Sequence, residues 1–178
     1  MMRRLYLAVR SFFDRSTQSS NVQPTNTQTK PILQPGQEGE RLPDSVIVLR
    51  LGVLSKDAQL APRANETHFT LSSDDKASKL QSLSVWAEEL TSAEAARELM
   101  GENSAEYRLV LYLNVDDIRA IRHPPDSTEA LLDVVWDPDT RTGAEGHSGI
   151  IGMMRDKGTR KVLRLRLIDL AKPKLLPD

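Results

Sequence analysis

The sequence predicts an α+β fold: a single small domain with a mixed or antiparallel sheet and a few short helices, preceded by a disordered tail. Three observations lead to this prediction. The chain has 178 residues, of which 39% are hydrophobic and 4% aromatic, so it can bury one aliphatic core without covalent staples. Short β-branched runs are interspersed with short helical segments. The composition changes sharply near residue 42.

The tail divides into two segments. Residues 1–15 place Leu5, Val9 and Phe12 on one side of a helix and carry four arginines against one aspartate. This basic amphipathic segment is typical of an organelle-targeting or translocation signal, of a helix in peripheral contact with an anionic membrane, or of a helix docked on the domain. Without such a signal we expect a cytoplasmic protein. Residues 16–42 are rich in Ser, Thr, Gln and Pro and predict a disordered linker, because they cannot bury enough apolar surface to offset ordering.

Residues 43–178 form the predicted α+β domain. β-Branched and alternating patterns predict strands over residues 45–54, 68–71, 107–115 and 131–136. Residues 83–90 are compatible with either a strand or the start of a helix. A capping box of Thr91 and Glu94 predicts a helix over 92–100 that ends at Gly101. Residues 116–121 predict a short helix capped by Asp116 or Asp117. Residues 162–167 alternate, which predicts a strand that passes into a short helix before Pro173.

Several functional classes are excluded or disfavoured. Without cysteine the chain has no disulfide framework, cysteine-ligated zinc, iron–sulfur cluster or thiol nucleophile. No histidine spacing of a metal motif, no phosphate-binding glycine loop and no EF-hand loop occurs, so we expect no metal and no cofactor. A net charge of −1 gives no overall attraction to nucleic acid. No apolar run reaches about 18 residues, so we expect no transmembrane segment.

Two histidines are the candidate catalytic residues. His147 lies between Gly146 and Gly149, where the backbone can approach a ligand closely, and its imidazole is either a general acid–base or a loop residue bonded to a nearby carbonyl. His68 is the second candidate if the fold brings it to His147; otherwise it is a structural histidine. In the catalytic hypothesis Arg119 or Arg141 holds a phosphate.

The C-terminal part of the chain is basic. On the predicted strand, Arg164 and Arg166 share the face opposite the leucines and form a candidate binding surface for nucleic acid or an acidic partner. No aromatic residue is interleaved with them, so base stacking is not supported. The alternative is a solvated face whose charges protect an edge strand from pairing.

Several short segments together resemble a loose family of small uncharacterised bacterial proteins. The matching positions span residues 68–171 and include His68-Phe69, Leu83-Ser84-Val85, Ile118-Arg119, the run from His147 to Gly152, and Leu170-Ala171. The resemblance implies one domain and a bacterial cytosolic setting, and it supplies no reaction. The tail and the strand at 45–54 depart from the family pattern.

The sequence therefore predicts a non-catalytic protein-binding or accessory module of a bacterial system, with a protein as its partner. The grounds are that no complete catalytic constellation, metal motif or cofactor motif occurs along the chain. The alternative is a small enzyme, a ribonuclease or a nucleotide-acting protein, that uses His147 with His68 and an arginine.

Overall fold

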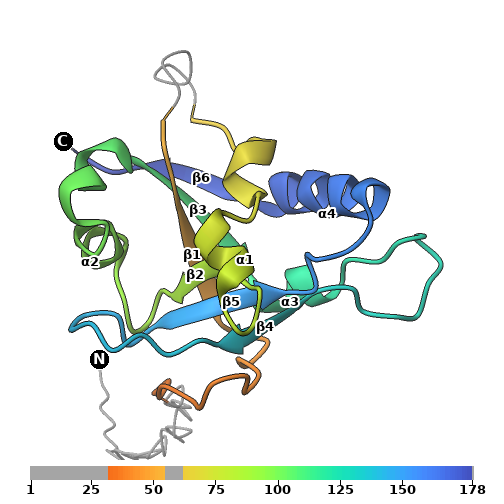
Figure 1. Cartoon of the computed structure of the whole chain (residues 1–178), viewed down its shortest axis with the longest axis horizontal. Coiled ribbons are helices and arrows are strands. Elements are labelled where there is room, and N and C mark those ends of the chain that lie inside the picture. The colour runs from red at the N-terminus through yellow and green to blue at the C-terminus, as the bar shows by residue number, and fades with distance from the viewer. Residues whose placement is uncertain (1–31, 55–61, 178) are drawn as a thin grey trace, which may run out of the picture. The chain divides into compact units, whose positions relative to one another are not determined.

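A computed structural model of the chain describes residues 32–54 and 62–177, and it shows one antiparallel sheet flanked by short helices (Figure 1). The strand order is β4-β5-β2-β1-β3-β6. The strands are β1 (Ile47–Gly52), β2 (Leu83–Ala87), β3 (Leu109–Asn114), β4 (Asp133–Trp136), β5 (His147–Ile151) and β6 (Lys172–Leu175). The helices are η2 (Glu66–Phe69), α1 (Ser73–Ala77), α2 (Ala93–Glu98), η3 (Gly101–Glu106), α3 (Val115–Arg119) and α4 (Lys157–Leu170). The α+β prediction is confirmed, and the sheet is antiparallel; the predictions for residues 1–31 lie outside the described part.

The sheet buries apolar side chains on both faces. Val48 of β1 pairs with Ala87 and Leu113, and these side chains belong to the larger core, which also receives Phe69 of η2, Ile118 of α3, and Leu163 and Leu167 of α4. The next residue, Leu49, points to the other face and packs in a smaller core with Trp86, Val110 and Ala96 of α2. The period-two alternation of the strands thus divides the leucines and valines between two layers of helices.

The outer edge of β4 is covered by the chain itself. Leu42 N donates to Val134 O at 3.0 Å, Gly39 N donates to Trp136 O at 2.8 Å, and Trp136 N donates to Glu40 O at 2.8 Å. The Leu42 side chain is only 2% exposed and belongs to the larger core. The packed part of the chain therefore begins before residue 43, whereas the sequence placed residues 37–42 in the linker.

The predicted strand over 162–167 is wrong: these residues lie within α4. Asp156 caps this helix by accepting from Gly158 N and Thr159 N. Leu163 and Leu167 are one helical turn apart and both fully buried, so the burial of this segment follows the helical period. The alternation of leucine with arginine does not correspond to a strand. As a consequence Arg164 and Arg166 do not share a face. Arg164 reaches Glu66 of η2, whereas Arg166 lines a different hollow, together with Asp117 of α3 and Arg122.

Three smaller predictions also change. The expected strand at 68–71 does not form: His68 and Phe69 end η2, a 3₁₀ helix with Asn65 as its N-cap and Thr70 as its C-cap. The cap of α2 is Ser92, since the Thr91 hydroxyl is buried and bonded to Gly143 O and Gly146 N. Helix α3 begins after Asn114 without a side-chain cap, so neither Asp116 nor Asp117 caps it. Residues 83–87 are a strand, and the helix predicted at 92–100 is confirmed as α2.

Candidate functional site

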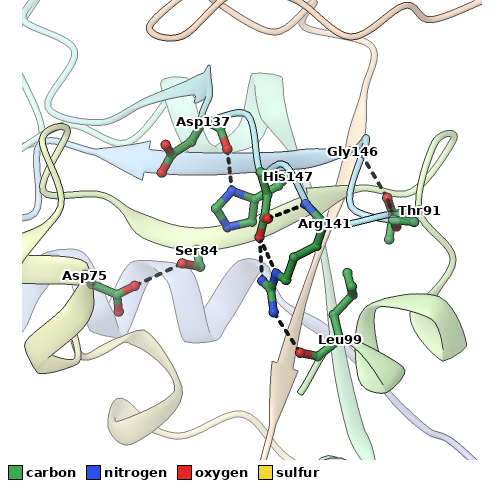
Figure 2. Close-up of polar contacts among 10 residues, drawn as sticks. Asp75, Ser84, Thr91, Leu99, Asp137, Arg141, Gly146 and His147 are labelled. Carbon is green, nitrogen blue, oxygen red and sulfur yellow. Dashed lines mark hydrogen bonds and ion pairs between the residues drawn. The ribbon is translucent and has the colours of Figure 1, made fainter. Parts of the chain in front are cut away.

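A polar groove of about 430 Å³ lies between α1, the start of β2 and the loop that follows β4. Its lining includes Asp74, Asp75, Ser84, Asp137, Arg141 and His147, which come from four separate segments of the chain. Figure 2 shows His147 beside Arg141, with Asp137 on one side of the ring and the Asp75–Ser84 pair further along the same side. This is where the structure places two of the sequence-predicted site residues, His147 and Arg141.

The ring of His147 is fixed in place at the start of β5. Its Nδ1 bonds to the carbonyl oxygen of Asp137, and because a carbonyl only accepts, Nδ1 carries the proton. In the neutral form of the ring, Nε2 is therefore the acceptor. The imidazole ring of His147 also packs edge-on against the Trp86 ring, with centroids 5.7 Å apart and an interplanar angle of 66°. His147 is half-buried and faces the groove.

Close packing under His147 explains one of the neighbouring glycines. A Cβ on Gly146 would lie 2.7 Å from the carbonyl oxygen of Ala87 and 2.8 Å from Thr91 Oγ1. Gly146 N donates to that same hydroxyl at 3.0 Å. The glycine is thus required by the approach of the α2 entry loop, and not by a ligand.

The charge of Arg141 is paired with a neighbouring carboxylate. Its Nη2 lies 2.5 Å and its Nε 2.8 Å from Asp139 Oδ2, and its Nη1 donates to Leu99 O at 2.8 Å. The hydrogen bond from Arg141 holds the pKa of Asp139 below its ordinary value, and the same bond raises the pKa of Arg141. The pair is therefore ionised on both sides, and the arginine is largely neutralised toward a further anion.

The other carboxylates are held by hydroxyl groups. Ser84 Oγ donates to Asp75 Oδ1 at 3.0 Å, and Ser72 N donates to Asp75 Oδ2 at 2.8 Å, which also caps α1. Ser82 Oγ donates to Asp137 Oδ2 at 3.0 Å. Asp74 is exposed at the rim. Four aspartates thus line the groove against one arginine, so the lining carries an excess of negative charge.

Arg50 supports the groove from behind and was not singled out by the sequence. Strands β1 and β2 pair only at Val48–Ala87 and Leu49–Trp86, and the Arg50 guanidinium fills the gap beyond these pairs. Its Nε donates to His68 O at 2.5 Å and its Nη1 donates to Ser84 O at 2.6 Å. Burial lowers the pKa of Arg50, and the nearby Asp75 carboxylate opposes that shift. The sequence feature that could have pointed to Arg50 is a single arginine inside an otherwise apolar strand.

His68 is engaged by the fold and lies apart from His147. Asn65 N donates to its Nδ1 at 3.1 Å, and its Nε2 lies 3.2 Å from Val53 O, so both ring nitrogens have backbone partners. The ring packs over Gly52 at the end of β1, where a Cβ would lie 2.7 Å from its Cδ2. Among the described contacts none joins His68 to His147, which lies on β5. Burial lowers the pKa of His68, and the nearby Arg50 adds to that effect.

Arg119 is a structural residue in this arrangement. Its Nε lies 2.6 Å from Asp133 Oδ1, its Nη1 pairs with Asp44, and its Nη2 donates to Val134 O at 3.0 Å. The side chain is 10% exposed. These bonds tie the segment before β1, helix α3 and strand β4 together, and they engage all three guanidinium nitrogens of Arg119.

Within residues 32–54 and 62–177, no group of three or more His, Asp or Glu side chains is placed to hold a metal ion. No helix in that same part of the chain is long and apolar enough to cross a bilayer. Comparisons of the chain with protein-family models, curated protein sequences and solved structures gave no significant match.

Proposed function

We propose that this chain is a non-catalytic protein-binding module, and that the acidic groove beside His147 takes a lysine or arginine side chain of the partner protein. The observation that carries the proposal is the charge balance of the groove. After Arg141 and Asp139 neutralise each other, the lining keeps Asp74, Asp75 and Asp137, and the buried Arg50 guanidinium behind Asp75 offsets part of that charge. An exposed concave surface with surplus carboxylates attracts cationic groups and repels phosphate.

The hydrogen bonding of the groove favours selective binding. Asp75 and Asp137 are fixed by serine hydroxyls, so their remaining lone pairs point in set directions before a partner arrives. The Arg141–Asp139 pair is itself anchored to Leu99 O. A preorganised acidic surface loses little side-chain entropy when a guanidinium or ammonium group binds.

The test uses full-length protein and a fluorescein-labelled peptide of alternating glycine and arginine, followed by fluorescence anisotropy. We expect binding that weakens with added salt, because mobile ions screen exposed charges over about 8 Å at physiological ionic strength. The double variant Asp74→Asn with Asp137→Asn should bind about tenfold more weakly, which corresponds to about 1.4 kcal/mol. The amide oxygen introduced at position 137 can still accept from Ser82, so the fold should persist in melting experiments.

The matched control is the double variant Asp116→Asn with Asp169→Asn. It removes the same number of charges from α3 and α4, away from the groove lining. The control should bind the arginine peptide as the unmodified chain does. The proposal fails if both double variants lose affinity equally, or if a peptide of alternating glycine and glutamate binds as well as the arginine peptide.

A small enzyme that acts on RNA or a nucleotide is the second candidate, favoured by the fixed tautomer of His147. With Nδ1 bonded to the Asp137 carbonyl, Nε2 is the acceptor that a general base needs. His147→Gln separates the two hypotheses. A binding module keeps its affinity for the arginine peptide in this variant, whereas an enzyme loses turnover of an RNA substrate without a change in melting temperature.

A further inference from the structure

A second hollow lies between η2, α1 and α4, and the charged side chains that line it are all cationic. It has a volume of about 60 Å³ and is lined by Lys76, Arg160 and Arg164 together with Thr70 over an apolar floor that includes Phe69 and Leu71. Asp74 and Asp75 face the groove, whereas the next residue, Lys76, lines this hollow. The short helix α1 thus contributes to both an acidic lining and a basic one.

Arg164 has donors that the protein does not use fully. Its Nη2 lies 3.4 Å from Glu66 Oε2, and its Nη1 lies 3.5 Å from Thr70 Oγ1, so both contacts are at the long end of their range. Its Nε is buried and has no hydrogen-bond acceptor within the described part of the chain. The Nε is covered by the protein, so the donors that an oxyanion in the hollow can engage are the two Nη groups, whose present contacts are long.

The helix places a second arginine beside the first. Arg160 and Arg164 are four residues apart on α4 and therefore lie on the same flank, while Lys76 approaches from α1. Glu66 is the carboxylate paired with this group, and it is 44% exposed at the rim. Three cations against one rim carboxylate leave the hollow with an excess of positive charge.

Size and composition define the ligand. A water molecule takes a share of about 30 Å³ in the liquid, so the hollow has room for a group larger than one water. Phe69 is fully buried and offers no exposed ring for stacking a base. Guanidinium groups bind the oxygens of a tetrahedral oxyanion through charge-assisted hydrogen bonds. From these observations we propose that the hollow is a phosphate-binding site, with Arg164, Arg160 and Lys76 as its ligands.

This inference is independent of the acidic groove and replaces the Arg164–Arg166 surface expected from the sequence. The phosphate can be a free anion or a phosphodiester of a nucleic-acid backbone, since both present the same oxygens. Without base contacts, backbone binding would not depend on nucleotide sequence.

The test titrates full-length protein with inorganic phosphate by calorimetry and by thermal shift, with chloride at equal ionic strength as the reference. We expect phosphate to bind and to raise the melting temperature. Arg164→Gln should weaken the apparent affinity by about tenfold or more, as loss of one charge-assisted donor pair does. Arg160→Gln should act in the same direction and leaves the contacts of Arg164 to Glu66 and Thr70 in place, which guards against a folding defect.

Arg166→Gln is the matched control, because it removes the same charge from the other flank of α4. It should keep the phosphate affinity of the unmodified chain. The second arm of the experiment uses short duplex DNA. If the duplex competes with phosphate, and Arg160→Gln loses the binding of both, the ligand is a nucleic-acid backbone. If phosphate binds and the duplex does not, the ligand is a free anion. The proposal is overturned if phosphate has no effect beyond chloride, or if Arg166→Gln weakens binding as much as Arg164→Gln.

Discussion

His68 is a neutral ring held between two backbone groups, and this makes stability depend on pH. Burial is the main cause that lowers its pKa below the ordinary 6.5. The folded chain therefore takes up the proton at lower pH than the unfolded chain does. The stabilisation from the neutral ring is complete above about pH 6.5 and is lost progressively as the pH falls below that value.

We expect the free energy of unfolding, measured with urea, to fall between about pH 7.5 and about pH 5.5. His68→Gln keeps an amide that can donate to Val53 O but has no proton to gain in this range, so the fall should be smaller in the variant. The comparison between the two chains cancels the other titrating groups to first order. An equal fall in both chains would contradict the assignment of His68.

At the scale of single elements, α4 shows what the sequence could and could not reveal. The strands predicted at 45–54, 107–115 and 131–136 contain β1, β3 and β4, because these runs are apolar enough to be buried in a sheet whatever surrounds them. Residues 162–167 satisfy both periods at once. The Asp156 cap and the turn spacing of Leu163 and Leu167 favoured the helix, while the leucine–arginine alternation favoured a strand.

The candidate site was predictable to the same limited degree. His147 stood out because glycines flank it, whereas Arg141 was named only as one of two arginines that could hold a phosphate. The carboxylates around them depend on the approach of α1 to the loop after β4, which no local pattern encodes. The ion pairs of Arg119 were hidden for the same reason, because its partners Asp44 and Asp133 are distant in sequence.

Leucine truncations on α4 distinguish helix from strand directly. Leu167→Ala removes a fully buried side chain and should lower the free energy of unfolding by about 3 kcal/mol. Leu165→Ala removes a side chain that is 42% exposed and should change it by about 0.5 kcal/mol or less. On a strand, Leu163, Leu165 and Leu167 would all face the core, so similar losses at Leu165 and Leu167 in chemical denaturation would contradict the helix.

At the scale of the whole molecule, both edges of the sheet are protected in different ways. The β6 edge carries Lys172, Pro173 and Lys174, which are exposed and unsuited to pairing with another strand. The β4 edge instead relies on backbone hydrogen bonds from residues 39–42, reinforced by the ion pair of Arg41 Nε with Asp133 Oδ2 at 2.7 Å. The segment just before the domain therefore contributes both to stability and to keeping the sheet from adding further strands.

Two truncated chains measure this contribution, because they differ only in residues 37–42. Compared with a chain that starts at Gln37, a chain that starts at Pro43 loses the buried Leu42 side chain, worth about 2 kcal/mol, and exposes the edge of β4. We expect the shorter chain to melt at a lower temperature in calorimetry and to self-associate with rising concentration in analytical ultracentrifugation. Equal melting temperatures and a monomeric shorter chain would show that residues 37–42 contribute nothing to the fold, and the backbone bonds to Val134 and Trp136 argue against that outcome.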